Sequence, residues 1–235
     1  MSIWGRLSAA THDLSLGGQI SSLLGFGPSS EERKLYAEPD NEVPFTVGVI
    51  ALSAKMAKAD GSVAADEVKA FKEAFKVSAA EMKQVAPVFN SAKRDAANFE
   101  DSAEQLVTVF RGNRKLLEDV LDGLFHIAKA DGEVHRQEEQ FLGEVAKRFG
   151  FTVSELNSIK ARHLVAAKRN PYYVLGVKPA ISDEDLKSHY RMLLADSHSE
   201  QLIARGVPKE FTVIAIEKRA ALSEAYEAIM KERSI

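Results

Sequence analysis

The chain has 235 residues, which at about 150 residues per domain allows one large domain or two modest ones. Apolar residues make up 45% of the chain and charged residues 28%, so a packed core can form and global disorder is excluded. The net charge of −3 argues against a general polyanion binder. The chain has 0 cysteines, which excludes disulfides, thiolate nucleophiles, zinc–cysteine sites and iron–sulfur clusters. A cytoplasmic location fits this composition.

Residues 1–30 form an N-terminal segment in which Arg6 and Asp13 are the only Asp, Glu, Lys or Arg residues. The segment lacks a run of about 18 apolar residues, and it lacks a basic start followed by an unbroken apolar stretch. It is therefore expected to be neither a transmembrane helix nor a signal peptide. Two interpretations stay open: a flexible tail, or an arm that docks on a partner or on the inner membrane surface through Ile3, Trp4 and Leu7.

Residues 31–165 show apolar residues at three- and four-residue spacing almost throughout, which predicts an all-α bundle. The expected helices cover residues 43–58, 65–76, 79–90, 102–111, 115–129, 136–149 and 153–167. Ser78 with Glu81 and Thr152 with Glu155 have the spacing of capping boxes. Gly150 stands where a glycine would end a helix.

A second unit is expected over residues 170–235, because Asn170-Pro171 interrupts the helical pattern. We expect a short helix near 172–175, a helix that begins at Ser182, a loop, and a long helix from Pro208. Proline suits the first turn of a helix, and Ser182 has Asp185 three residues later as a cap partner.

The bundle contains an internal repeat. Residues 58–63 (KADGSV) match residues 129–134 (KADGEV), 71 residues further along the chain. Gly61 and Gly132 suit the left-handed conformation that ends a helix. Two interpretations of the acids in the two copies stay open: each aspartate caps the helix that follows it, or the acids form an oxygen-rich site for a divalent cation. The candidate ligands are Asp60, Glu67, Asp131 and Glu138.

The doubled Ala-Asp-Gly-x-Val turn, followed by a glutamate in an all-helical setting, resembles the TerB family of tellurite-resistance and stress proteins. The resemblance covers residues 42–165. It implies a helical domain in which acids of these turns bind a divalent cation, and Asp60, Glu67, Asp131 and Glu138 are the positions that match.

The C-terminal unit resembles a J domain, the module by which DnaJ-type co-chaperones engage DnaK-type chaperones. Residues 170–177 (NPYYVLGV) resemble its opening and residues 182–194 its second helix. Residues 202–210 have the Leu-x-Ala-x-Gly-x-Pro-x-Glu spacing of the DjlA subgroup, which joins a TerB-like domain to a C-terminal J domain. The opening residues 1–6 (MSIWGR) are also similar to that subgroup. The residues that this resemblance assigns to chaperone binding are Lys187, Tyr190, Arg191, His198, Ser199 and Glu200.

The chain departs from the J-domain signature, because His198-Ser199-Glu200 stands where the family has His-Pro-Asp. Ser199 does not fix φ as proline would, and Glu200 carries its carboxylate about 1.5 Å further from the backbone. The second helix is also less basic than J domains usually are. Two functions therefore stay open: a co-chaperone that stimulates a DnaK-type ATPase, and a degenerate regulator or scaffold that does not. For Tyr190 the alternative is core packing, and for His198 a solvated loop side chain.

Other function classes find little support. The chain has 6 histidines, none of them paired at metal-ligand spacing, and it has no nucleophile elbow, P-loop or dinucleotide motif. We expect a protein that is not an enzyme, with no nucleic-acid partner. A local basic patch at Lys160, Arg162, Lys168 and Arg169 keeps the nucleic-acid alternative open. A second copy of the chain stays open as a partner.

Overall fold

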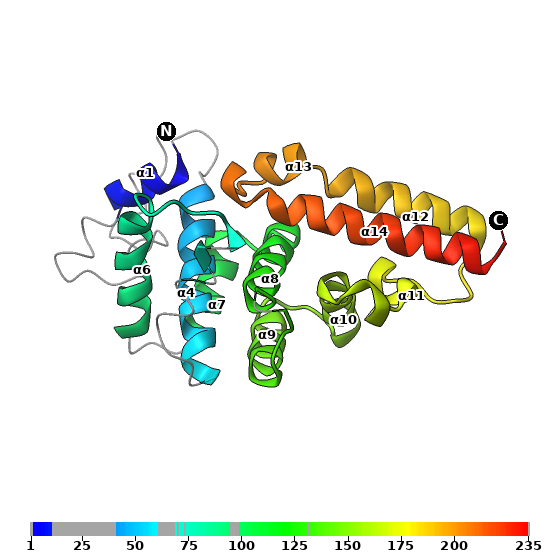
Figure 1. Ribbon diagram of the computed structural model, residues 1–235, viewed down its shortest axis with the longest axis horizontal. Helices are drawn as coiled ribbons and strands as arrows, with labels where there is room; N and C mark the ends of the chain where they lie inside the picture. The colour runs from blue at the N-terminus through cyan, green and yellow to red at the C-terminus, as the bar shows by residue number, and fades with distance from the viewer. Residues whose placement is uncertain are drawn as a thin grey trace.

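The computed structural model describes residues 2–10, 41–60, 69, 71–72, 74–94, 99–130 and 132–234, and this part of the chain contains helices and no strand (Figure 1). The all-α fold class is confirmed. The α-helices are α1 (Ile3–Ala10), α4 (Glu42–Asp60), α6 (Met82–Arg94), α7 (Phe99–Val109), α8 (Arg114–Ala128), α9 (Arg136–Arg148), α10 (Val153–His163), α11 (Pro171–Leu175), α12 (Asp183–Asp196), α13 (Ser199–Ala204) and α14 (Val213–Glu232). Two 3₁₀ turns, η2 (Ala166–Lys168) and η3 (Lys209–Phe211), complete the order.

The expected start and stop signals are confirmed. The backbone N–H of Ser78 donates to Glu81 at 2.9 Å and the N–H of Glu81 donates back to the Ser78 hydroxyl at 3.3 Å. Thr152 and Glu155 form the same reciprocal pair at the start of α10. Gly150 has a φ of 80° just after α9. These local bonds satisfy backbone groups that a helix end leaves free.

The region between α12 and α14 is more ordered than the sequence indicated. It holds the short helix α13, and α14 begins at Val213 rather than at Pro208. Pro208 has a ψ of 147°, so it is extended and precedes η3 instead of opening the long helix. Half of the helix expected over 65–76 lies outside the described residues; of the other half, residues 69, 71, 72 and 74 are helical.

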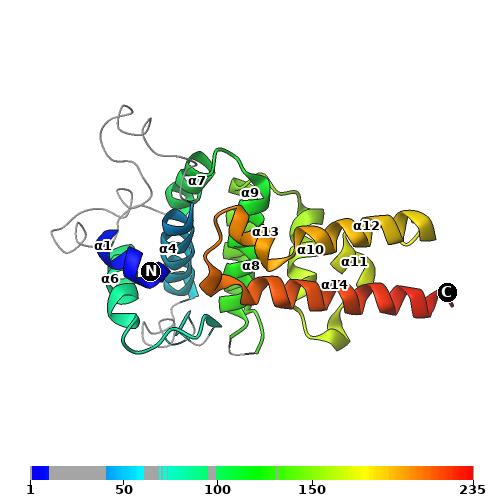
Figure 2. The same ribbon diagram turned by 90° about the horizontal axis from the view of Figure 1, so that it is seen from above.

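The core of the bundle contains a cluster of aromatic rings, and one of them, Phe211, comes from the C-terminal unit. Phe211, which is fully buried, lies 4.2 Å from Phe75, 5.4 Å from Phe45 and 5.8 Å from Trp4 between ring centroids. Leu202, Val207, Ile214 and Ala215 belong to the same core. The segment from α13 to the start of α14 is therefore built into the bundle, and α14 extends from it (Figure 2). The boundary expected near residues 165–170 stays a prediction.

The expectation for the first residues is wrong in one respect. Ile3, Trp4 and Leu7 are almost completely buried, and α1 packs against α4 and α6. The N–H of Ile3 also donates to Glu210 at 3.1 Å. These side chains form neither a free tail nor an exposed arm, because the bundle core covers them. Residues 11–30 lie outside the described residues.

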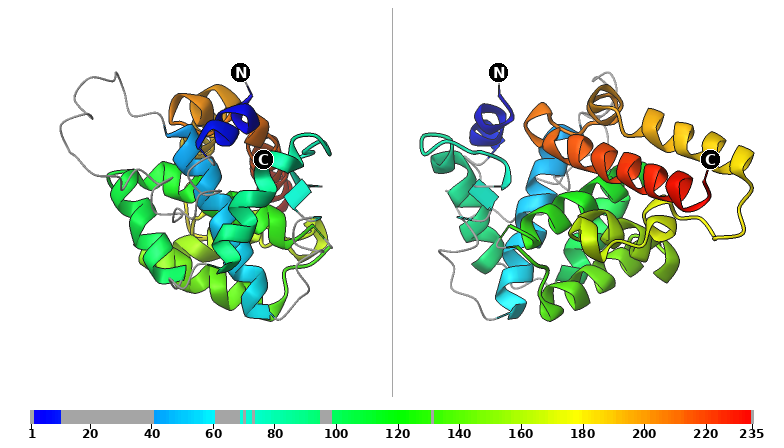
Figure 3. Two further views of the ribbon diagram at one scale, coloured as in Figure 1. Left: turned by 90° about the vertical axis from the view of Figure 1, so that its left-hand side faces the viewer. Right: turned by 45° about the vertical axis from the view of Figure 1, so that its right-hand side comes forward.

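A second, smaller core holds α11, α12 and the end of α14 together. It contains Tyr172, Leu175, Leu186 and Leu222, with Ala161 of α10. Helices α12 and α14 run side by side away from the bundle (Figure 3). Ser182 caps α12, as expected, and Asn170 caps α11.

Candidate functional site

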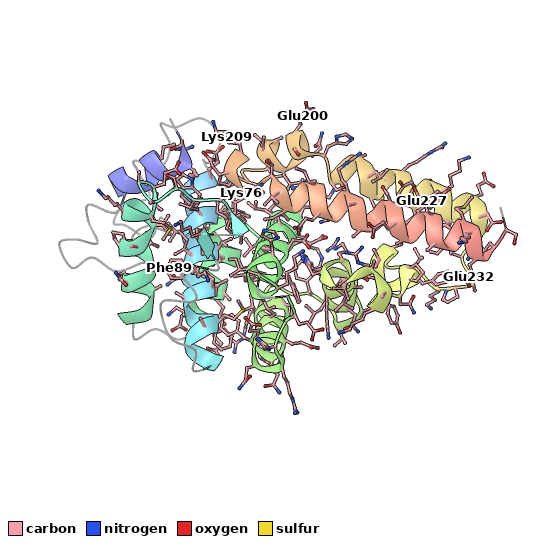
Figure 4. All side chains as sticks on the ribbon, in the orientation of Figure 1. Lys76, Phe89, Glu200, Lys209, Glu227 and Glu232 are labelled. Carbon is pink, nitrogen blue, oxygen red and sulfur yellow. The ribbon has the colours of Figure 1, made fainter. Side chains whose placement is uncertain are left out.

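The loop between α12 and α13 carries the residues that align with the His-Pro-Asp signature. Ser197, the C-cap that follows α12, is fully buried, whereas His198 is the exposed N-cap of α13. Glu200 is exposed and lies at the outer edge of the molecule (Figure 4). The loop therefore presents an imidazole and a carboxylate to solvent.

The backbone of this loop has the conformation that a proline at position 199 would require. His198 has φ −66° and ψ 139°, the extended region that a residue before proline prefers. Ser199 is the first residue of α13, a position where proline is favoured because its missing N–H has no helical acceptor. Although serine stands here in place of the proline of the signature, the backbone of the loop could accommodate proline at position 199.

The outer face of α12 carries two cations available to a partner. Lys187 and Arg191 are exposed and form no ion pair with any residue in the described ranges. Two acids that offset them in the sequence are paired elsewhere: Asp183 with Arg233, and Asp196 with Lys115. Glu184, three residues before Lys187 on the same face, is also exposed and offsets part of this positive charge.

Tyr190 is held inside the C-terminal unit. Its ring stacks on Tyr226 with centroids 4.1 Å apart and planes at 3°. Its hydroxyl lies 3.1 Å from the Ser223 hydroxyl. These contacts favour the core-packing alternative, because the interactions of the side chain are made with α14.

A buried ion pair ties the loop to the bundle. Arg205 follows α13, and its Nε and Nη2 donate to the two carboxylate oxygens of Asp119 in α8 at 2.8 and 3.1 Å. Its Nη1 donates to the carbonyl of Asp196, the last residue of α12, at 3.1 Å. Burial raises the pKa of Asp119 to about 6, against the lowering effect of Lys218 and Arg205. Burial thus disfavours the ionised form of this carboxylate. The planar guanidinium of Arg205 matches its geometry, because it donates to both carboxylate oxygens.

A second group of buried charges joins α8, α10 and α14. Lys218 donates to Glu118 at 2.8 Å and to Asp122 at 3.0 Å, and His163 lies 2.9 Å from Asp122. Burial alone would raise the pKa values of both acids. Lys218 and Arg162 outweigh it, so that the pKa of Glu118 falls to about 2 and that of Asp122 falls well below its usual range. The two acids therefore stay ionised near neutral pH.

Sequence reasoning missed the acids of α8. Glu118, Asp119 and Asp122 lie within a helix whose other residues are mostly apolar. Asp119 and Asp122 are fully buried, three residues apart on one face. Acids inside such a run were the available signal, because a carboxylate on a buried face needs a cationic partner.

The basic patch considered for nucleic acid is not a free cationic surface. Each of its four members pairs with an acid in the described structure: Lys160 with Glu139, Arg162 with Glu118, Lys168 with Glu133 and Arg169 with Glu224. Arg162 is also buried. This arrangement neutralises the patch, which argues against phosphate binding there.

The candidate cation ligands are only partly described. Glu138 accepts the N–H of His135 at 2.8 Å and so helps to cap α9, whose N-cap is His135 rather than Asp131. Gly132 has a φ of 119°, as expected for its turn. Glu67, Asp131 and the side chain of Asp60 lie outside the described residues. Among the side chains that are described, no group of three or more His, Cys, Asp or Glu could hold a metal.

Comparison with known proteins agrees with the two resemblances. Residues 46–161 match the family model described as Tellurite resistance protein TerB. The chain is 26% identical to Co-chaperone protein DjlA of Vibrio cholerae serotype O1, over 94% of this chain and 87% of the relative. It is 25% identical to Co-chaperone protein DjlA of Photobacterium profundum, over 98% and 99%, and 28% identical to that of Coxiella burnetii, over 77% and 74%. No solved structure matches the chain.

The fold and the matched region thus define a helical protein with a TerB-type domain. Over nearly its whole length the chain is a relative of the DjlA co-chaperones, and the resemblance read from its motifs is confirmed. Across the described ranges, no helix has the length and apolar character needed to cross a membrane.

Proposed function

We propose that the protein is a co-chaperone that recruits a DnaK-type chaperone through residues 170–235 and accelerates its ATP hydrolysis. The surface that would bind the chaperone consists of the loop 198–200 and the exposed cations Lys187 and Arg191. The relatives named as DjlA co-chaperones support this role, and no motif for enzymatic chemistry competes with it.

The observation that carries the proposal is the backbone at the loop. His198 is extended and Ser199 opens α13, so the chain follows the path that the His-Pro-Asp signature would give. The His198 imidazole and the Glu200 carboxylate consequently project to solvent from neighbouring positions. A partner cation can meet Glu200 after a shift of about 1.5 Å, the length of the added methylene.

The alternative function is a regulator or scaffold that binds a partner without stimulating ATP hydrolysis. Glu200 is the residue that favours it, because a charge-assisted hydrogen bond worth roughly 1.5–3 kcal/mol depends on geometry. Changing Glu200→Asp would then create stimulation where the natural chain has none.

Single-turnover ATP hydrolysis by the DnaK-type chaperone from the same organism distinguishes the two functions. We expect the natural chain to increase the rate and His198→Ala to abolish the increase. Gln201→Ala, an exposed neighbour on α13, is the matched control and should leave it unchanged. For the cationic face, Lys187→Glu should weaken stimulation, whereas Lys231→Glu, at an exposed position of α14, should not. Stimulation that survives His198→Ala would contradict the proposed site.

We also propose that the repeated turns bind a divalent cation, the property that the TerB resemblance implies. The acids concerned are Asp60, Glu67 and Asp131, with Glu138 contributing only if it leaves its capping bond with His135. Calorimetry with calcium, magnesium, zinc and manganese tests this. Heats that are the same for the natural chain and for an Asp60→Asn, Asp131→Asn variant would refute the site.

A further inference from the structure

The His198-Ser199-Glu200 loop is restrained from outside its own unit. The residues that follow it, Leu202 and Val207, are fully buried in the core of the bundle. Ser197, which precedes it, is also fully buried. The loop therefore exposes His198 and Glu200, while the residues on both sides of it are held in the interior.

Arg205 connects the chain before and after this loop to helix α8 of the bundle. Its guanidinium contacts Asp196 before the loop and Asp119 of α8, while its own backbone lies just after α13. One planar group thus sets the distance between the end of α12, the end of α13 and α8. A fork of this kind fixes direction as well as distance.

The backbone beside Arg205 is restrained as well. Gly206 has a φ of 103°, and a Cβ at this position would lie 2.4 Å from the Cβ of Asn41. The Asn41 amide donates to the Arg205 carbonyl at 3.4 Å. The chain at 205–206 therefore fits closely against the start of α4 and admits only glycine at 206 without a shift.

Stability alone does not account for the Asp119–Arg205 pair. The pKa of Asp119 is raised, because the desolvation of its carboxylate outweighs the electrostatic stabilisation that Lys218 and Arg205 provide. Buried ion pairs of this kind are often replaced by apolar residues with no loss of stability. What the pair supplies and apolar residues would not is a directed link between α8 and both ends of the loop.

We propose that Asp119 and Arg205 are positioning residues that hold the His198-Ser199-Glu200 loop in its chaperone-binding conformation from the bundle. The pair supplies the restraint that proline would otherwise supply at position 199. This inference rests on the proposed co-chaperone function and assigns the bundle a part in it. The TerB-type domain then acts as the support of the loop, and a ligand that moves α8 would alter stimulation.

The test uses the full chain with the pair replaced by residues of similar size, Asp119→Leu with Arg205→Met, so that no buried charge is left unpartnered. Glu217→Gln is the matched control, because Glu217 of α14 bonds His126 of α8 and Lys129, which follows α8, without touching the loop. We expect the double variant to keep its helical content and the maximal ATPase rate. It should need about tenfold more protein for half-maximal stimulation, since preorganisation is what it has lost. Adding Ser199→Pro should recover that concentration to within about threefold of the natural chain.

Hydrogen exchange provides a readout that does not depend on the chaperone. The amides of Gln201, Leu202 and Val207 donate within the loop region and should exchange faster in the double variant but not in Glu217→Gln. Unchanged exchange, or unchanged half-maximal concentration in a chain that stimulates, overturns the positioning role. If the natural chain does not stimulate at all, the proposed function fails, and faster exchange alone then supports the positioning role.

Discussion

Phe211 provides a direct test of how firmly the C-terminal unit is built into the bundle. Its ring is fully buried and contacts Phe75, Phe45 and Trp4, which come from three other segments of the chain. Phe211→Ala removes the ring and leaves a cavity among aromatic neighbours that can collapse only in part. Substitutions of this kind cost about 3–5 kcal/mol of unfolding free energy.

That loss is large relative to a typical stability of about 5–15 kcal/mol. At roughly 2–4 °C per kcal/mol for a chain of this size, the melting temperature should fall by about 6–20 °C. The chain has 1 tryptophan, Trp4, and it lies 5.8 Å from Phe211 between centroids, so its fluorescence reports this cluster.

Urea unfolding followed by Trp4 fluorescence and by far-ultraviolet circular dichroism measures the effect. We expect both probes to shift together to lower urea, because the bundle and the start of α14 share one core. Ile216→Ala is the control, since that side chain is 63% exposed on the same helix and should change stability by less than about 0.5 kcal/mol. A loss below about 1 kcal/mol in Phe211→Ala, with unaltered Trp4 emission, would show that the unit is not anchored as described.

Three further predictions concern the loop and its support. Asp119→Asn should change the pH dependence of stability, because Asp119 has a pKa of about 6 when folded and about 4 when unfolded and so holds a proton in the folded state that the unfolded chain releases. Between pH 4 and pH 6.5 in urea titrations the natural chain should therefore lose about 2 kcal/mol of unfolding free energy relative to the variant; a constant difference would contradict the raised pKa. Ser199→Pro should raise the unfolding free energy by about 0.4–1 kcal/mol, because the backbone already suits proline, and a destabilised variant in thermal melts would show that it does not. Gly206→Ala should destabilise the chain by more than about 1 kcal/mol through its positive φ and the contact with Asn41, whereas Gly143→Ala, with no neighbour closer than 3.9 Å, should not.

The helices and their ends could be predicted because they depend on nearby residues. Thr152 and Glu155 are three residues apart, and their reciprocal bonds form whatever the rest of the chain does. The same holds for Ser182 and Asp185 at the start of α12. The short helix α11 within residues 170–177 was also expected, since its start at Asn170-Pro171 depends only on neighbouring residues.

The partners of apolar faces could not be predicted in the same way. A low content of charge in residues 1–30 is compatible with binding to a membrane surface and with burial in a protein core. The packing of Trp4 on Phe211 shows that the first helix is buried in the core. Helix α13 was missed because six residues are too few for a periodic pattern. The pairing of Asp119 with Arg205 spans 86 residues, a separation at which no local spacing rule applies.

The measurement that tests the central proposal most directly is single-turnover ATP hydrolysis by the DnaK-type chaperone of the same organism, titrated with the full natural chain and with His198→Ala. We expect the rate to rise with the natural chain and to saturate, and His198→Ala to leave the basal rate. A rate that stays basal at tens of micromolar natural chain would contradict the co-chaperone function. If Glu200→Asp then stimulated ATP hydrolysis, the natural protein would be a regulator or scaffold that binds a partner without stimulating it.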